Sequence, residues 1–230
     1  MGEQRIVGDR ANLGLALGRA FERAASSAID ARGRFAIALT GGSTAKLYEA
    51  ITPPGPTVAR CHFWFGDERG VAPDHPDSNY ALARRTLLDR LGVSPDQVHR
   101  MHAELADLEQ AARAYETELG QAPLDVVMLG VGPDGHVASL FAGHALLAER
   151  TRRVAWLDDS PKPPPRRVTL TLRALGEARE LWLFAMGAEK ASVVRRALVE
   201  GDLSLPAALA ASGARAVTWF LDDEATAELG

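Results

Sequence analysis

The chain has 230 residues, 47% of them hydrophobic, so it can bury a full core without disulfides or structural metals, and its length fits a single domain over residues 1–230. Its formal net charge of -4 excludes a global basic field for nucleic acid, and no apolar run in it approaches the roughly 18 residues of a membrane helix. Cys61 is its only cysteine, which excludes an intrachain disulfide or a cysteine-based zinc cluster, and we expect a cytoplasmic protein in a reducing compartment.

Helical and strand-like apolar patterns alternate along the chain. Apolar residues recur at helical spacing from Leu13 to Ala28, with Asp9 as a capping residue upstream. Further helices are predicted at Thr44–Ile51, from a cap at Ser78 through Leu91, and at Asp107–Leu119, Glu189–Glu200, Pro206–Ala211 and Glu224–Leu229. Short buried strands are predicted at RFAIALT, CHFWFG, LDVVMLGV, RVAWL, RVTLTL, ELWLFAMG and RAVTWFL. This alternation predicts an α/β fold with helices on both faces of a mostly parallel sheet.

The stretch DDSPKPPPRR interrupts this alternation, because its prolines are incompatible with a helix or a central strand. A domain linker is one interpretation. The residues that follow it, 168–230, alternate strand and helix as before, so we predict a loop within one domain.

Three polar, glycine-containing loops each follow the end of a predicted strand. They are TGGSTAK, GDERGVAPDHPDSN and GVGPDGHVAS. Ligands of parallel α/β sheets bind beyond the carboxyl ends of the strands. If these strands are parallel, all three loops lie along one edge of the sheet, where we expect the functional site.

The first of these loops has the features of an anion site. Gly41 and Gly42 allow backbone amides to approach a ligand, while Ser43 and Thr44 add hydroxyl donors at the start of a helix. The lysine spacing of a P-loop is missing. A tight turn in which Ser43 or Thr44 only caps the helix explains the same residues.

The second loop gathers charged side chains after an aromatic strand. Asp67 and Arg69 stand at the strand end, where a buried sheet delivers residues to a cleft. A solvated charged loop is the ordinary explanation of such a cluster, and the local sequence does not decide between the two.

The third loop, VVMLGVGPDGHVASLF, contains G-x-G-x-x-G and ends in a histidine. A dinucleotide site also needs a later acidic residue, which Asp158 nearly supplies. Against that interpretation, Asp134 would place negative charge where a pyrophosphate should lie, and Gly143 interrupts the expected crossover helix. His136 instead has the unperturbed pKa of a general base near neutrality. A structural histidine is the alternative, and a metal site is disfavoured because His136 and Asp134 supply only two ligands.

Two cationic positions come later in the chain. Arg166 and Arg167 begin a predicted strand, and Lys190 stands in the first turn of a predicted helix, where it opposes the helix dipole. An anionic ligand would offset that cost, although solvation at the surface explains these residues equally well.

Taken together, these stretches resemble the 6-phosphogluconolactonases of the glucosamine-6-phosphate isomerase/6-phosphogluconolactonase superfamily. The resemblance covers nearly the whole chain in order, through LTGGSTAKLY, FGDERGVAPDHPDSNY, LDVVMLGVGPDGHVASLF, RVTLTLRAL and GAEKASVV. It implies a Rossmann-like three-layer α/β/α sandwich. It also implies a carboxylic ester hydrolase that converts 6-phosphoglucono-1,5-lactone to 6-phosphogluconate in the oxidative pentose phosphate pathway, with no redox cofactor. From the ligand count above we expect no metal either.

The same resemblance assigns roles to individual residues. His136 matches the histidine that activates water, with Asp134 and Asp67 at acidic positions near it. Residues that match the sugar-phosphate side are Gly41, Gly42, Ser43, Thr44, Arg69, Arg167 and Lys190. Backbone amides or Asn79 are the candidates for stabilising the oxyanion. We also expect Gly130 and Gly132 to let the chain turn at the strand end, and Gly135 to keep the backbone slim beside the ligand.

The resemblance leaves competing functions to weigh. In the related glucosamine-6-phosphate deaminase/isomerases, a glutamate five residues after the histidine completes a relay, but here that position is Phe141. A non-catalytic sugar-phosphate-binding domain is a second alternative, and a nicotinamide-dependent enzyme is a third. The expected partner is a small sugar-phosphate lactone, without nucleic acid or membrane, in a monomer or small homo-oligomer.

Overall fold

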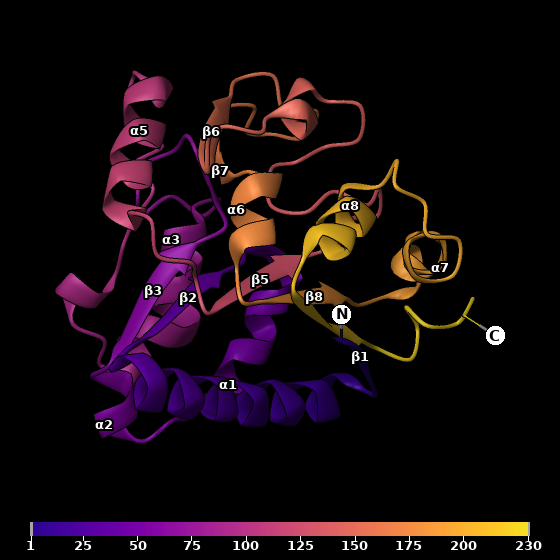
Figure 1. Ribbon diagram of the computed structural model, residues 1–230, viewed down its shortest axis with the longest axis horizontal. Helices are drawn as coiled ribbons and strands as arrows, with labels where there is room; N and C mark the ends of the chain where they lie inside the picture. The colour runs from indigo at the N-terminus through magenta and orange to yellow at the C-terminus, as the bar shows by residue number, and fades with distance from the viewer. Residues whose placement is uncertain (1, 230) are drawn as a thin grey trace.

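A computed structural model describes residues 2–229 and shows one large sheet between two layers of helices (Figure 1). The strands are β1 (Gly2–Val7), β2 (Phe35–Leu39), β3 (Cys61–Phe65), β4 (Asp67–Arg69), β5 (Val126–Gly130), β6 (Val154–Leu157), β7 (Arg167–Leu170), β8 (Glu180–Ala185) and β9 (Ala216–Leu221). The α-helices are α1 (Arg10–Arg32), α2 (Gly55–Val58), α3 (Asn79–Ala83), α4 (Asp89–Leu91), α5 (Leu108–Leu119), α6 (Leu172–Glu177), α7 (Ala191–Leu198) and α8 (Pro206–Gly213). Tighter 3₁₀ segments are η1 (Gly42–Ala50), η3 (Pro95–Gln97), η4 (Ala145–Ala148) and η5 (Ala188–Lys190), and the segment η2 (Arg84–Leu88) is a π-helix.

The central sheet has six strands in the order β1-β9-β8-β5-β2-β3, and every neighbouring pair is parallel. The predicted mostly parallel α/β fold is therefore confirmed. From β2 the chain goes first to β3 on one side and later to β5 on the other, so the direction of winding reverses between β2 and β5. Ligands of such sheets bind at this switch point.

The first helix shows how local sequence sets an element. The Asp9 side chain accepts a hydrogen bond from the Asn12 amide at 2.8 Å, which caps α1, and Gly33 ends it with φ 77°. Leu13, Leu17 and other apolar residues at helical spacing form its buried face. As Figure 1 shows, α1 runs along one face of the sheet, while α5, α6 and α8 cover the other.

Alternate residues of the central strands serve the two layers. Ile37 and Leu39 pack on the α1 side, whereas Ala38 faces the core under α5 and α6. The β2 residues on both faces of the sheet are apolar because helices cover both faces, as expected for a parallel strand.

Three differences from the sequence prediction concern the sheet and the C-terminal segment. In addition, α2 and α6 were not predicted, and the helix predicted at Thr44–Ile51 is the 3₁₀ segment η1. β6 and β7 leave the central sheet and form a small antiparallel sheet with β4, because the chain bends at Gly66 and carries 67–69 away from β3. The strand β1 has no apolar run and escaped prediction, since it lies at the edge of the sheet and, within residues 2–229, pairs only with β9. The helix predicted at Glu224–Leu229 is wrong: this segment forms turns, and the Asp222 carboxylate accepts from the Ala225 and Gly187 amides instead.

Among residues 2–229, no helix is both long enough and apolar enough to cross a membrane.

Candidate active site

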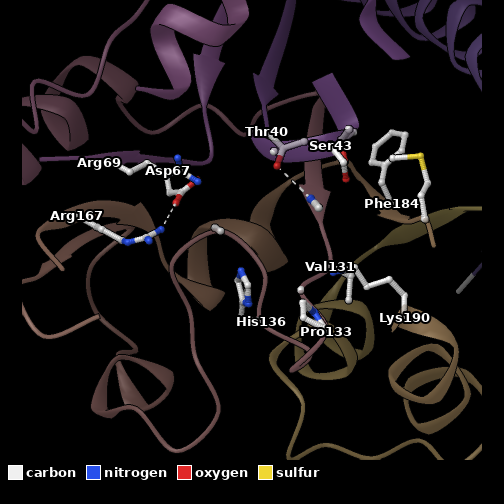
Figure 2. A pocket seen from close by; sticks show the side chains of 17 residues that line it. Thr40, Ser43, Asp67, Arg69, Val131, Pro133, His136, Arg167, Phe184 and Lys190 are labelled. Atoms are coloured by element: carbon white, nitrogen blue, oxygen red, sulfur yellow. Dashed lines mark hydrogen bonds and ion pairs between the residues drawn. The ribbon is translucent and has the colours of Figure 1, made fainter. Parts of the chain in front are cut away.

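The loops that follow β2 and β5 enclose a pocket of about 190 Å³ at the switch point of the sheet (Figure 2). Nine of the residues predicted from sequence line it: Gly41, Gly42, Ser43, Thr44, Asp67, Arg69, His136, Arg167 and Lys190. The other two lie behind this lining, where Asp134 contacts His136 and Asn79 contacts Asp67. The structure therefore brings the three predicted loops to one edge.

The glycine loop after β2 is fixed by its neighbours. The Tyr48 hydroxyl donates to the Thr40 carbonyl at 2.7 Å and accepts from the Thr40 amide at 2.9 Å. The Thr40 hydroxyl in turn accepts from the Gly130 amide at 3.1 Å, which joins this loop to the end of β5 (Figure 2). Gly42 has φ 68°, a conformation that favours glycine. The loop thus presents a preformed backbone to the pocket.

The loop after β5 aims His136 at the pocket. The amide of Gly132 donates to the His136 carbonyl, and the amide of Gly135 donates to the Gly132 carbonyl, both at 2.9 Å. A Cβ added at Gly132 would lie 2.6 Å from Asp134 Oδ1 and closer still to the imidazole ring. Glycine is therefore required at 132 because the imidazole lies against its backbone.

The role expected for Gly135 is wrong. Its φ is +79°, and a Cβ there would meet Leu205 Cδ2 at 2.7 Å and Val193 Cγ2 at 3.1 Å. It allows α7 and α8 to approach the loop, and it does not make room for a ligand. No helix follows the glycines at once, since residues 132–144 form turns before the short η4, which also removes the crossover helix of a dinucleotide site.

A short hydrogen bond sets the state of the imidazole. His136 Nδ1 lies 2.5 Å from Asp134 Oδ1, so a neutral ring donates its Nδ1 proton to the carboxylate and leaves Nε2 as the basic nitrogen. Burial lowers the pKa of His136, although Asp134 acts in the opposite direction. For Asp134, hydrogen bonds from His136 and Lys162 outweigh the effect of burial and bring its pKa to about 2. At neutral pH this favours an ionised Asp134 beside a neutral His136.

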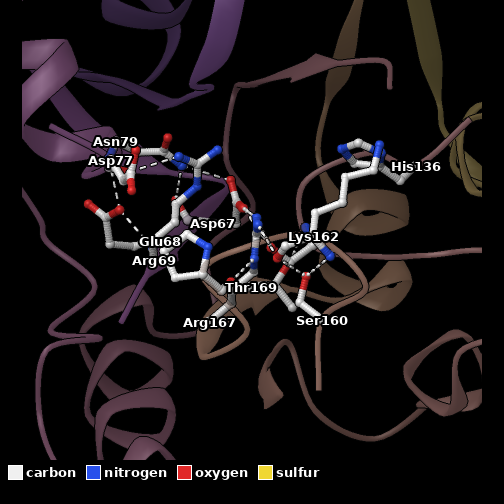
Figure 3. A network of polar contacts seen from close by, with 12 residues as sticks. Asp67, Glu68, Arg69, Asp77, Asn79, His136, Ser160, Lys162, Arg167 and Thr169 are labelled. Atoms are coloured by element: carbon white, nitrogen blue, oxygen red, sulfur yellow. Dashed lines mark hydrogen bonds and ion pairs between the residues drawn. The ribbon is translucent and has the colours of Figure 1, made fainter. Parts of the chain in front are cut away.

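Asp67 is fully engaged in a buried network (Figure 3). One carboxylate oxygen accepts from Asn79 Nδ2 at 2.9 Å, and the other accepts from Ser139 Oγ at 2.6 Å. The same oxygen lies 3.7 Å from Arg167 Nη1. Asn79 is therefore directed to Asp67 and the backbone of Gly41 rather than to a substrate oxygen, which leaves the backbone amides as oxyanion candidates.

The neighbouring Glu68 holds β4 and the start of α3 together through hydrogen bonds. Its carboxylate accepts from the amides of Arg69, Asn79 and Tyr80 at 2.7–2.8 Å and from Ser78 Oγ at 2.9 Å. Burial raises the pKa of Glu68, and these four donors counteract the rise. The carboxylate thereby ties β4 to the start of α3.

The three predicted cations, Arg69, Arg167 and Lys190, all line the pocket but lie on different sides of it. Figure 2 shows Arg69 and Arg167 on one side, near Asp67, and Lys190 on the opposite side, with His136 between them. Arg167 is buried, and its guanidinium group donates most of its hydrogen bonds to the backbone carbonyls of residues 162–164. Lys190 makes no ion pair within the described part of the chain, and burial lowers its pKa. Arg69 likewise makes no ion pair within residues 2–229, and its Nη1 donates to the Asp77 carbonyl at 2.8 Å, so Lys190 and Arg69 are the pocket cations that no carboxylate pairs.

Within residues 2–229, no group of three or more metal-binding side chains is gathered.

Three residues that support the site are not predicted from the sequence. Thr40 joins the two loops, Ser139 donates to Asp67, and Lys162 contacts both Asp134 and His136. Ser139 lies within a quoted motif, but nothing local indicated its partner. Lys162 stands inside the proline-rich stretch, where a lysine between prolines is the one signal that a fixed cation is present.

Known proteins are similar to this chain in sequence and in fold. Residues 8–219 match the family model described as glucosamine-6-phosphate isomerases/6-phosphogluconolactonase. The 6-phosphogluconolactonase of Homo sapiens is 44% identical over 218 residues, which cover 89% of this chain and 84% of the human protein. That of Mycobacterium tuberculosis is 40% identical over 230 residues and covers 93% of each chain. The structure of 6-phosphogluconolactonase from Trypanosoma cruzi matches with a TM-score of 0.86 at 29% identity, covering 100% of this chain and 98% of that one.

Proposed function

This chain belongs to the glucosamine-6-phosphate isomerase/6-phosphogluconolactonase family, and on that premise we propose that it is an enzyme that hydrolyses 6-phosphoglucono-1,5-lactone to 6-phosphogluconate. The observation that carries this proposal is the pairing of His136 Nδ1 with Asp134 in a pocket that the glycine loop and Lys190 also line. In this role the enzyme would act in the oxidative pentose phosphate pathway, in the cytoplasm.

The proposed reaction begins with a water molecule between His136 Nε2 and the lactone carbonyl. Nε2 removes a proton from the water as its oxygen attacks the carbonyl carbon, and Asp134 stabilises the imidazolium that forms. The tetrahedral oxyanion then collapses, the bond from carbon to ring oxygen breaks, and the imidazolium returns its proton to the departing oxygen. The carboxylic acid product ionises, so each turnover releases one proton.

We propose that the phosphate binds on the Lys190 side, against the loop 41–44. Lys190 supplies a charge that protein carboxylates have not already neutralised, and the loop supplies backbone amides and the Ser43 hydroxyl. The lactone ring then lies toward His136, with Arg69 and Arg167 beyond it. A direct phosphate contact by Arg69 or Arg167 stays a prediction, and their position across the pocket from Lys190 makes it the weaker one.

The deaminase alternative is disfavoured by the residue that faces the histidine. The ring of Phe141 is buried, and its centroid lies 5.0 Å from that of His136. An apolar ring cannot accept a proton or polarise an imidazole, so the relay that ring opening of an amino sugar needs is incomplete.

The test is proton release on mixing wild-type protein with freshly prepared 6-phosphoglucono-1,5-lactone, with glucosamine-6-phosphate as the control substrate. We expect acidification well above the spontaneous rate with the lactone and no ammonia from the amino sugar. A rate of lactone hydrolysis equal to the spontaneous rate would mean that the pocket at most binds the sugar phosphate, and it would refute the proposal.

A further inference from the structure

The proline-rich loop 160–165 is held in one place by a buried arginine. Arg167 Nη2 donates to the carbonyls of Lys162 and Pro163 at 3.0 and 3.1 Å, and Arg167 Nε donates to that of Pro164 at 3.0 Å. Ser160 Oγ donates to the Lys162 carbonyl at 2.9 Å and accepts from the Lys162 amide at 3.2 Å. The backbone of Lys162 is therefore fixed at both its amide and its carbonyl.

The side chain of Lys162 ends at the catalytic pair. Its Nζ lies 3.0 Å from Asp134 Oδ2 and 3.4 Å from His136 Nδ1, and Figure 3 shows it extended toward the imidazole. Asp134 thus uses one oxygen for His136 and the other for Lys162. Lys162 does not line the pocket, whereas His136 does.

We propose that Lys162 is a positioning residue for lactone hydrolysis, holding Asp134 so that its other oxygen stays on His136 Nδ1, and opposing protonation of the resting imidazole by its charge. The proposal rests on the proposed function, in which His136 starts each turnover as a neutral base.

The charges around His136 show why a cation is needed there. Asp134 and Asp67 both favour the imidazolium, whereas Lys162 disfavours it, and Lys190 and Arg167 line the same pocket. Phe141, whose ring packs against the imidazole of His136, carries no charge. With two carboxylates near it and no Lys162, the imidazole would hold its proton to higher pH and be a less available base.

The experiment compares Lys162→Met, which keeps chain length but loses the charge, with Lys162→Arg, which keeps the charge, and with Lys46→Met as an exposed control in η1. In Lys162→Met we expect the acidic limb of kcat/KM to move up by about 0.5–1 pH unit, the size expected for a solvent-screened charge at this separation. At a pH below that limb, this is a loss of about 3–10-fold in rate. Lys162→Arg and Lys46→Met should keep the wild-type limb.

An NMR titration of the His136 ring in the substrate-free protein separates this proposal from the proposed function. The resonance is assigned among the six histidines by its loss in His136→Asn. An upward shift of the His136 pKa in Lys162→Met, restored in Lys162→Arg, supports the coupling whether or not the lactone is the substrate. An unmoved titration, or a uniform loss of rate at all pH values, would overturn it, because a merely structural lysine would act in that way.

Discussion

Replacing Gly132 with alanine should disable the enzyme while leaving its fold intact. The added Cβ would lie 2.6 Å from Asp134 Oδ1 and nearer still to the ring of His136, whereas ordinary contact begins at 3.4 Å. The ring packs against Phe141 and its Nδ1 is bound to Asp134, so any movement of the ring disturbs both contacts. The imidazole must therefore shift by roughly 1 Å, a displacement that costs on the order of 100-fold in rate, or about 2.7 kcal/mol of transition-state stabilisation.

The assay is steady-state proton release from the lactone at pH 7.5, together with thermal unfolding of each variant. The matched control is Gly213→Ala, whose methyl enters open space at the end of α8. We expect Gly132→Ala to lose about 100-fold in kcat with a near-native Tm, and Gly213→Ala to keep full activity. If Gly132→Ala retained more than half of the wild-type kcat, the close contact between backbone and imidazole would not position the base.

Three further outcomes follow from the site. Lys190→Ala should raise KM by about 10–100-fold, the loss expected for one charge-assisted hydrogen bond to phosphate. The exposed Lys46→Ala should leave KM unchanged, and equal KM values for the two variants would show that Lys190 does not bind the phosphate. The acidic limb of kcat/KM should lie below about pH 6.5, because burial lowers the pKa of His136 and the base is active only when neutral; a limb above that value would contradict the assignment. Glu68→Gln should lower the free energy of unfolding, measured by urea titration, by about 2–3 kcal/mol, because the new amide nitrogen would face buried N–H donors. Asp74→Asn, at an exposed position, should leave the free energy of unfolding unchanged.

The sequence was sufficient to predict the parallel sheet and the loops that line the pocket. Apolar runs such as LDVVMLGV end in glycine loops, and parallel pairing then places those loops together at the edge where β2 and β5 diverge. Residues at the ends of buried strands are predictable because their backbone position follows from the sheet alone.

Features that depend on contacts between distant segments escaped prediction. The edge strand β1 exists only because β9 offers it a partner, and its own residues carry no strand pattern. The orientation of Asn79 toward Asp67, the packing role of Gly135 and the contact of Lys162 with Asp134 all join segments that no local spacing relates. The separation of Lys190 from the two arginines has the same origin.

The central claim is that His136 Nε2 is the base that activates water. Its most direct test is the single-turnover rate of lactone hydrolysis by His136→Asn at pH 7.5, beside His102→Asn as an exposed control. We expect a loss of about 10²–10⁴-fold for His136→Asn and none for His102→Asn. A His136→Asn enzyme that hydrolyses the lactone at the wild-type rate would contradict it.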